Sequence, residues 1–380
     1  MNKSRGDIVF IAGDGAPGRI MLEVSKKLKD DGLPFSHLLQ KNRGAEKLFQ
    51  DEEEPHLSVS PKNYRNLYQK INKSCKCLVV GHSYPLYQVE LKASKIAFEL
   101  KIPIIKIFDH ELSYKNEHFQ RWIKLWELAK KPPIVITVIH DNHYREILSL
   151  YPQLKPSLKL IGNPLHYNQK ESMPQCRKKF RDSLSLGHED KILSVFLGSK
   201  NAKHFLELLT ATDKVVEYLA NHYHVAVLLD IHYNVLSEWQ KHLGDYLKKW
   251  QLKGTRVITE IKQDQMIIAS DLVLTSPLST TNERAISYNI PIIQNLTTTT
   301  VEQLKEYGLN DPPFTLEGKI KAVLWVNELM SSEDVAKVVS DALNPKLQQK
   351  RFLSAKKAGI IPPPKALDKL HDLIKSFVVK

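Results

Sequence analysis

The stretch DLVLTSPLSTTNERAISYNIPII, residues 271–293, contains two apolar runs with the length and branching of buried strands. The first run ends in a segment rich in hydroxyl side chains, and a helical pattern with an acid near its beginning leads to the second run. The stretch therefore predicts a strand, loop, helix and strand in succession. This succession is the repeating unit of a parallel α/β sheet.

The loop of this unit carries polar side chains suited to a ligand. Ser279, Thr280 and Thr281 can cap the helix, and their hydroxyls and its free N–H groups suit a phosphate or a sugar hydroxyl. Glu283 can accept two hydrogen bonds from a ribose diol. A capping box, in which the acid only satisfies the helix end, explains the same residues equally well.

Strand and helix patterns alternate along the rest of the chain, from DIVFIAG at residues 7–13 to IPIIQ at residues 290–294. The alternation of strand and helix patterns is interrupted at residues 163–174, which we interpret as a linker. The sequence thus predicts an α/β protein with two doubly wound, Rossmann-like lobes and a cleft between them. We expect the lobes over residues 1–165 and 175–345, followed by a basic helical tail over residues 346–380.

Composition narrows the class of protein. No apolar stretch approaches the roughly 20 residues that a membrane helix needs, and the apolar run near the N-terminus resembles a first strand more than a secretory signal. The three cysteines fit neither a disulfide framework nor a zinc site. We therefore expect a cytoplasmic protein.

The formal net charge of +13 is concentrated at the C-terminus, where residues 346–380 hold nine Lys or Arg against two Asp. An anionic membrane surface fits this excess, and so does a solvated face without a partner. Nucleic acid is not expected as a partner, because no recognised binding module accompanies the charge. Leu367, Leu370, Ile374 and Phe377 share one helical face, which predicts a final helix that packs on a lobe or, alternatively, lies on a membrane.

Two glycine-containing turns follow predicted strands. Gly13 and Gly15 lack the spacing of the dinucleotide fingerprint, but they allow the backbone to approach a ligand closely. Gly198, Ser199 and Lys200 offer a tight turn, a hydroxyl and a cation at a helix start, as a pyrophosphate requires. Lys200 can equally be a solvent-facing lysine.

Six short motifs occur in the order and roughly the spacing found in lipid-A-disaccharide synthase, a glycosyltransferase of the two-lobed GT-B fold that uses a UDP-sugar. They are AGDGAPGR, VVGHSYPLYQ, IHDNHYREIL, LIGNPLHY, VFLGSK and LTSPLSTTNE. The chain resembles this family from residue 8 to about residue 295. The last motif is also similar to the donor site of UDP-sugar hydrolases and of UDP-N-acetylglucosamine 2-epimerases.

The resemblance implies an acceptor in the first lobe and a nucleotide-sugar donor in the second. The donor residues that it implies are Gly198, Ser199, Lys200, Ser279, Thr280 and Glu283. We also assign Gly13 and Gly15 to nucleotide-sugar binding. Lys200 stands where the family usually has an arginine, so the phosphate would meet a point charge without bidentate geometry.

The acid that serves as the usual candidate base of the family is replaced by Leu86. His82 and Asp109 stand at strand ends in the first lobe, where either can deprotonate an acceptor hydroxyl. A capping or hydrogen-bonded structural role explains each of them equally well. No cofactor and no metal site is expected, because the histidines of IHDNH have no evident third ligand.

The sequence as a whole predicts a glycosyltransferase that moves a hexosyl or N-acetylhexosaminyl group from a UDP donor to a glycan or lipid acceptor. We expect it to act in the cytoplasm, at or near the inner face of a membrane. A UDP-sugar hydrolase or 2-epimerase of the same fold is the first alternative. A non-catalytic binding protein is the second.

Overall fold

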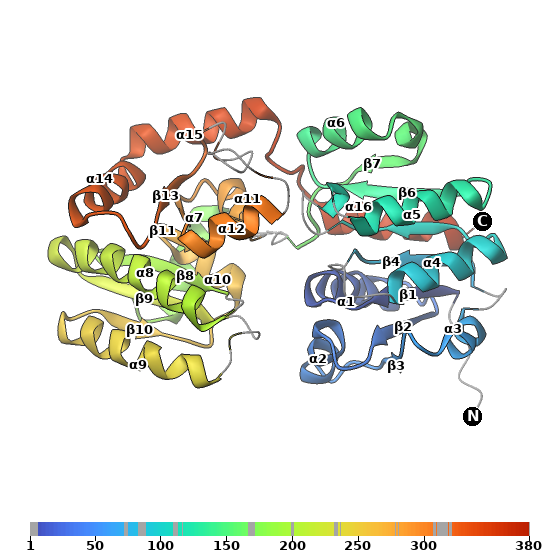
Figure 1. Cartoon of the computed structure of the whole chain (residues 1–380), viewed down its shortest axis with the longest axis horizontal. Coiled ribbons are helices and arrows are strands. Elements are labelled where there is room, and N and C mark those ends of the chain that lie inside the picture. Colours follow the sequence, from blue (N-terminus) through green and yellow to red (C-terminus); the bar gives the residue numbers. More distant parts are fainter. Residues whose placement is uncertain are drawn as a thin grey trace. The chain divides into compact units, whose positions relative to one another are not determined.

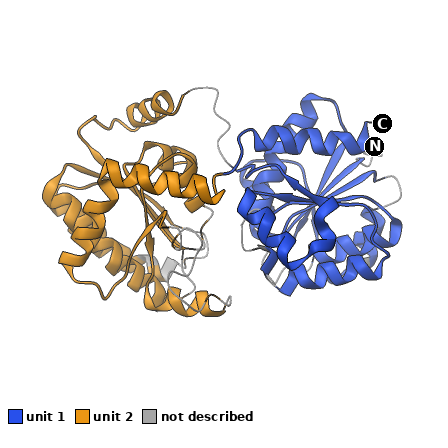
Figure 2. Cartoon of the chain, turned by 90° about the horizontal axis from the view of Figure 1, so that it is seen from above, with its two compact units in different colours: residues 1–168, 362–380 blue, residues 169–361 orange. Residues whose placement is uncertain are grey.

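The structure is a computed structural model. It describes residues 7–71, 75–82, 89–108, 113–115, 117–165, 172–198, 201–231, 235, 237–277, 279, 281–306, 309, 318 and 321–379. The chain divides into two compact units (Figure 2). Unit 1 comprises Met1–Asn168 and Pro362–Lys380, and unit 2 comprises Gln169–Ile361.

Unit 1 is built on a seven-stranded sheet (Figure 1). Its strands are β1 (Ile8–Ala12), β2 (Phe35–Gln40), β3 (Leu57–Val59), β4 (Cys77–Val80), β5 (Ile104–Lys106), β6 (Ile134–Val138) and β7 (Leu158–Leu160). Its helices are α1 (Gly15–Asp30), α2 (Gly44–Asp51), α3 (Tyr64–Lys70), α4 (Val89–Leu100), α5 (Glu117–Leu128), α6 (Asp141–Leu150) and α16 (Ala366–Val378), with short 3-10 turns at Ser113–Lys115 and Pro152–Ser157. The strands pair in parallel in the order β3-β2-β1-β4-β5-β6-β7, so the order reverses between β1 and β4.

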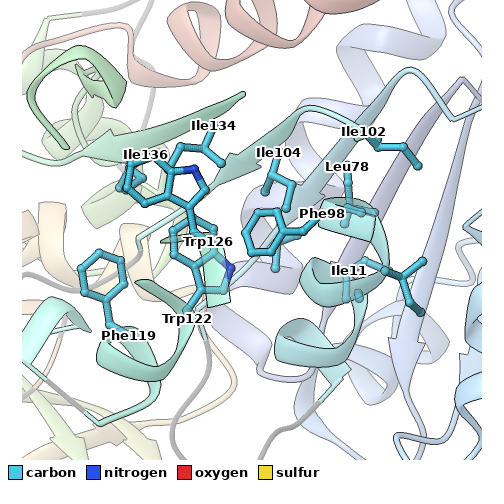
Figure 3. Close-up of a cluster of buried hydrophobic side chains, with 14 of the residues drawn as sticks. Ile11, Leu78, Phe98, Ile102, Ile104, Phe119, Trp122, Trp126, Ile134 and Ile136 are labelled. Carbon is cyan, nitrogen blue, oxygen red and sulfur yellow. The ribbon is translucent and has the colours of Figure 1, made fainter. Parts of the chain in front are cut away.

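Helices cover both faces of this sheet, which explains why its central strands β1 and β4 are continuous buried apolar runs. On one face, Trp122 and Trp126 of α5 pack with Phe98 of α4 over Ile104 and Ile136 of the strands (Figure 3). A second apolar cluster on the other face joins β1 to α1, α2 and α16. Both faces of the sheet are therefore core.

The C-terminal helix α16 belongs to this second cluster. Leu370 and Ile374 are fully buried in it, and Leu367 and Phe377 pack against it. Lys375 donates to Asp31 at the end of α1, with 2.7 Å between nitrogen and oxygen. The prediction of a final helix that packs on a lobe is confirmed.

Unit 2 has the same architecture, a parallel sheet with helices, and its sheet has six strands. They are β8 (Lys191–Leu197), β9 (Val225–Ile231), β10 (Arg256–Ile258), β11 (Leu272–Thr275), β12 (Ile292–Asn295) and β13 (Leu324–Val326). The helices are α7 (Met173–Ser183), α8 (Ala202–His222), α9 (Ser237–Leu252), α10 (Gln263–Ala269), α11 (Thr281–Ser287), α12 (Thr298–Glu306), α14 (Ser332–Leu343) and α15 (Pro345–Ala358). The parallel order β10-β9-β8-β11-β12-β13 reverses between β8 and β11 (Figure 1).

These two sheets confirm the predicted doubly wound α/β fold, including the strand, helix and strand of residues 271–293. The division at the C-terminus differs from the expected tail over residues 346–380, because α15 belongs to unit 2 and α16 to unit 1. Gly359, with φ of 71°, ends α15, and the prolines that follow it do not continue a helix. Among the helices that the structure describes, none is both long enough and apolar enough to cross a membrane.

Candidate functional site

The reversal of strand order in unit 2 lies between β8 and β11, whose residues Val195 and Leu274 are paired in register. In open α/β sheets, ligands bind outside the carboxyl ends of the strands at such a reversal. Gly198 directly follows β8, and Ser279 and Glu283 follow β11. Three of the predicted donor residues therefore lie at this position. Ser199, Lys200 and Thr280 are outside the described residues.

The loop after β11 is held in shape by Asn282, which is 1 % exposed. Its amide nitrogen donates to the carbonyl oxygens of Ser276 at 2.9 Å and Pro277 at 3.1 Å. The Ser279 hydroxyl accepts a hydrogen bond at 3.2 Å from the N–H of Thr281, the first residue of α11. The described loop residues Ser276, Pro277 and Ser279 are thus hydrogen-bonded to the first turn of α11. Asn282 was not predicted from the sequence, although an amide side chain in the first turn of a helix indicates a possible contact with the preceding loop.

Buried polar atoms that form no hydrogen bond within the described part of the chain lie at the carboxyl ends of β11 and β12 and in the first turn of α11. They are Thr275 Oγ1, Gln294 Nε2, both amide atoms of Asn295 and Asn282 Oδ1. Thr275 and Gln294 are paired in register, and Asn295 is 0 % exposed. Leaving one such atom unsatisfied costs about 1–3 kcal/mol, so a group of them usually has a water or ligand partner. This edge of unit 2 is therefore suited to a polar ligand.

The N-terminus of α12 is closed to an anionic ligand by acidic side chains. The N–H of Thr298 donates to Glu328 at 3.1 Å, and the N–H of Thr299 donates to Glu207 at 2.9 Å. Burial acts to raise the pKa of Glu207, but hydrogen bonds from Thr299 and Thr297 and the charge of Lys203 together outweigh it and lower the pKa below its ordinary value. Two carboxylates therefore already stabilise the positive end of this helix. A phosphate would have to bind elsewhere on the edge.

His204 fixes the beginning of α8 against α12. Its ring contacts the Thr300 hydroxyl through Nε2 at 3.0 Å and the Gln303 amide through Nδ1 at 3.3 Å. The N–H of His204 donates at 2.8 Å to Asn201, the N-cap of α8. Because α8 begins just after Gly198, His204 fixes the helix start that would face a ligand. The residue was not singled out from the sequence, since its partners lie about a hundred positions further along the chain.

In unit 1, Gly13 follows β1 and Gly15 begins α1, beside the reversal of that sheet. The N–H of Gly13 donates to Glu90 at 2.8 Å, and the N–H of Gly15 donates to Asp14 at 2.7 Å. Glu90 is 4 % exposed and comes from the first turn of α4. Both amides therefore already bind carboxylates, which disfavour a phosphate at this turn.

His82 follows β4 at the same edge and is 6 % exposed. Its ring meets Phe108 and Phe119 edge to face, with centroid distances of 5.3 and 6.2 Å. Lys106, 2 % exposed at the end of β5, donates to the carbonyl oxygen of Gly81 at 3.0 Å. Lys106 was not predicted from the sequence, although a lysine within an apolar strand run is unusual. The other candidate base, Asp109, and the substituted position Leu86 lie outside the described residues.

The histidine pair of the IHDNH motif has a structural role. His140 caps α6, since its Nδ1 accepts a hydrogen bond from the N–H of His143 at 3.1 Å, and both residues are buried. Within the described ranges, the structure contains no group of three His, Cys, Asp or Glu side chains that could hold a metal ion.

The two units together, each a parallel sheet with Rossmann-like strand order and polar side chains at its reversal, define the GT-B fold, as the sequence predicted. No family model matches the sequence, and no curated protein matches it either. Solved structures match along the whole chain at low identity. MurG from Acinetobacter baumannii is 13 % identical, with a TM-score of 0.65 and coverage of 97 % of this chain and 99 % of that one.

Two further matches are structures with bound nucleotides. The UDP-GlcNAc 2-epimerase from Neisseria meningitidis, bound to UDP-GlcNAc, is 13 % identical, with a TM-score of 0.62 over 98 % of this chain and 99 % of that one. Anabaena Alr3699/HepE in complex with UDP and glucose is 13 % identical, with a TM-score of 0.56 over 98 % of this chain and 100 % of that one. At these identities the likeness establishes the fold.

Proposed function

We propose that the chain is a glycosyltransferase that binds a UDP-sugar in unit 2 and transfers the sugar to a glycan or lipid acceptor bound by unit 1. The reaction takes place in the cytoplasm, at the inner face of a membrane. The observation that carries this proposal is the group of buried, unpartnered polar atoms of Thr275, Gln294 and Asn295 beside the Asn282-held loop. Matching structures bound to UDP, UDP-glucose or UDP-GlcNAc support a uridine nucleotide as the donor carrier.

The diphosphate binds at the beginning of α8, because the beginning of α12 is occupied by Glu207 and Glu328. Helix α8 is 21 residues long, so its positive end favours an anion. Gly198, Ser199 and Lys200 supply the turn, a hydroxyl and a cation at this helix start.

The loop after β11 completes the donor site. Ser279 and Thr280 contribute hydroxyls, and Glu283 accepts from the ribose diol. Gly13 and Gly15 take no part in nucleotide binding in this assignment, because Glu90 and Asp14 already accept from their amides.

In the transfer step, the acceptor hydroxyl loses its proton to a base, its oxygen forms a bond to the anomeric carbon, and UDP leaves with the electron pair of the broken bond. His82 or Asp109 acts as the base. Lys200 and the N–H groups at the start of α8 stabilise the charge that develops on the leaving diphosphate.

Calorimetric titration with UDP, GDP, CMP, ADP and their sugar conjugates tests the donor site. We expect UDP compounds to bind and Lys200→Ala and Glu283→Ala each to weaken binding by about 1–3 kcal/mol. Lys248→Ala, which removes an exposed lysine of α9, is the control and leaves the affinity unchanged. Unchanged affinity in both site variants would refute this assignment.

Incubation with labelled UDP-N-acetylglucosamine, with and without a membrane extract, tests the reaction. Transfer predicts UDP release together with label in an extractable product, and replacement of the base lowers turnover by about 10²–10⁴ while donor affinity is retained. UDP and free sugar that accumulate without any labelled product would contradict transfer.

A hydrolase or 2-epimerase is the second candidate, because 2-epimerase structures match the chain with TM-scores of 0.62 and 0.63. A hydrolase releases free sugar without an acceptor, and an epimerase converts the labelled sugar to its C2 epimer. A protein that binds UDP and converts no donor would be a binding protein of this fold.

A further inference from the structure

Helix α15 presents a row of lysines to solvent. Lys346, Lys350, Leu353 and Lys357 follow one another at intervals of four, three and four residues, which places them on one side of the helix. All four are exposed, and Leu353 is 54 % exposed. Lys356 is exposed beside them. We call these five residues the α15 lysine face.

The opposite side of α15 packs on unit 2. Ala355 is fully buried there, and Arg351 and Phe352 lie with Ile286 and Ile290 around a small cavity. Arg351 donates to the carbonyl oxygen of Asp341 at 2.9 Å, and burial lowers the pKa of its guanidinium. The only arginine of the helix is therefore turned inward, and the charges on the α15 lysine face are all ammonium groups.

These ammonium groups are not neutralised by neighbouring acids. Helix α15 contains no Asp or Glu. Across the described ranges of the chain, no carboxylate forms an ion pair with a lysine of this face. On α9, by contrast, Lys249 lies 2.5 Å from Asp213. The α15 lysine face thus keeps its full positive charge, which favours an anionic partner.

We propose that the α15 lysine face binds the surface of an anionic membrane. A lysine carries a mobile point charge without bidentate geometry. Lysines are therefore better suited to bind a fluid array of lipid headgroups than to bind carboxylates held at fixed positions. Leu353, in the middle of the face, is placed to enter the interface between headgroups while the lysine stems lie along it. Helix α16 is not available for this contact, because Leu370 and Ile374 are buried in unit 1.

Membrane binding by this face rests on the proposed function, because an acceptor at a membrane requires the enzyme to stay at that surface. The binding itself needs no catalysis. It can therefore be measured separately.

Co-sedimentation of the full chain with vesicles tests the proposal. We expect binding to vesicles of phosphatidylcholine mixed with phosphatidylglycerol, little binding to phosphatidylcholine alone, and a steep loss of binding as salt is added. Replacing Lys346, Lys350 and Lys357 together by glutamine should weaken binding by about 100-fold, since each lysine near such a surface contributes about fivefold. Leu353→Ser should lower it further.

The matched control replaces three other exposed lysines of unit 2, Lys241, Lys248 and Lys337, by glutamine. This variant has the same net charge and should lose much less than the variant of the α15 lysine face. Equal losses in the two variants, or equal binding to neutral and anionic vesicles, would overturn the proposal.

Two further measurements separate the alternatives. Binding of the α15 lysine face to polyglutamate or duplex DNA as tightly as to anionic vesicles would also overturn the membrane assignment, since it would indicate a general polyanion surface. UDP affinity is measured in parallel. Vesicle binding without UDP binding refutes the proposed donor site alone, and UDP binding without vesicle binding refutes the membrane surface alone.

Discussion

Replacing Asn282 by alanine removes the two hydrogen bonds that hold the loop after β11. The carbonyl oxygens of Ser276 and Pro277 lose their donor, so we expect the free energy of unfolding to fall by about 2–4 kcal/mol at roughly 1–2 kcal/mol for each bond. A loop that is no longer preorganised should also bind UDP about tenfold more weakly. Urea denaturation and calorimetric titration measure the two effects.

Asn282→Asp sharpens the test because it keeps the shape of the side chain. The new carboxylate oxygen faces the two carbonyl oxygens that the amide nitrogen now contacts, so repulsion is added to the lost hydrogen bonds. We therefore expect Asn282→Asp to be less stable than Asn282→Ala. Gln153→Ala, which removes one exposed hydrogen bond to Glu127, is the control and should change stability by less than about 0.5 kcal/mol. Wild-type stability and UDP affinity in Asn282→Asp would refute the reasoning.

Three other predictions test the fold. Asp271→Ala removes the carboxylate that binds two arginines of α7 and should lower the free energy of unfolding by about 3 kcal/mol. The control, Asp182→Ala, removes one partner of an exposed ion pair and should change the free energy of unfolding by less than about 0.5 kcal/mol. Equal effects of the two variants in urea denaturation would contradict the prediction. Burial lowers the pKa of His37 from 6.5 to about 4, so the unfolded chain takes up the proton first as pH falls. The contribution of neutral His37 to the free energy of unfolding is fully present above the pKa of the unfolded chain, and it should decrease by about 2 kcal/mol by about pH 5. A His37→Phe variant whose stability depends on pH as the wild type does would refute this role of His37. Gly81→Ala places a Cβ 2.5 Å from a proline side chain of α1 and should destabilise the protein by about 1–3 kcal/mol. Gly244→Ala places a Cβ in open space on α9 and should stabilise the protein by about 0.5–1 kcal/mol. Scanning calorimetry measures both effects.

The sequence by itself determined the class of the fold. Strands buried on both faces are continuous apolar runs, as in β1, where all five residues are buried. Such runs can be recognised in the sequence without any tertiary information. The hydroxyl-rich loop after β11 and the glycine after β8 were readable as well. The carboxyl ends of parallel strands lie at one edge of a sheet, which is why the sequence predicts a single site for these two segments.

Only the tertiary structure decided which groups lie at the strand ends of the two sheets. Glu90 accepts from Gly13 across 77 positions of sequence, and His204 meets Thr300 across 96. The apolar face of α16 was evident in the sequence, but any apolar surface can bury such a face, so only the fold could place it in unit 1. Hydrogen bonds and burial depend on neighbours in space, whereas the sequence patterns depend on neighbours along the chain.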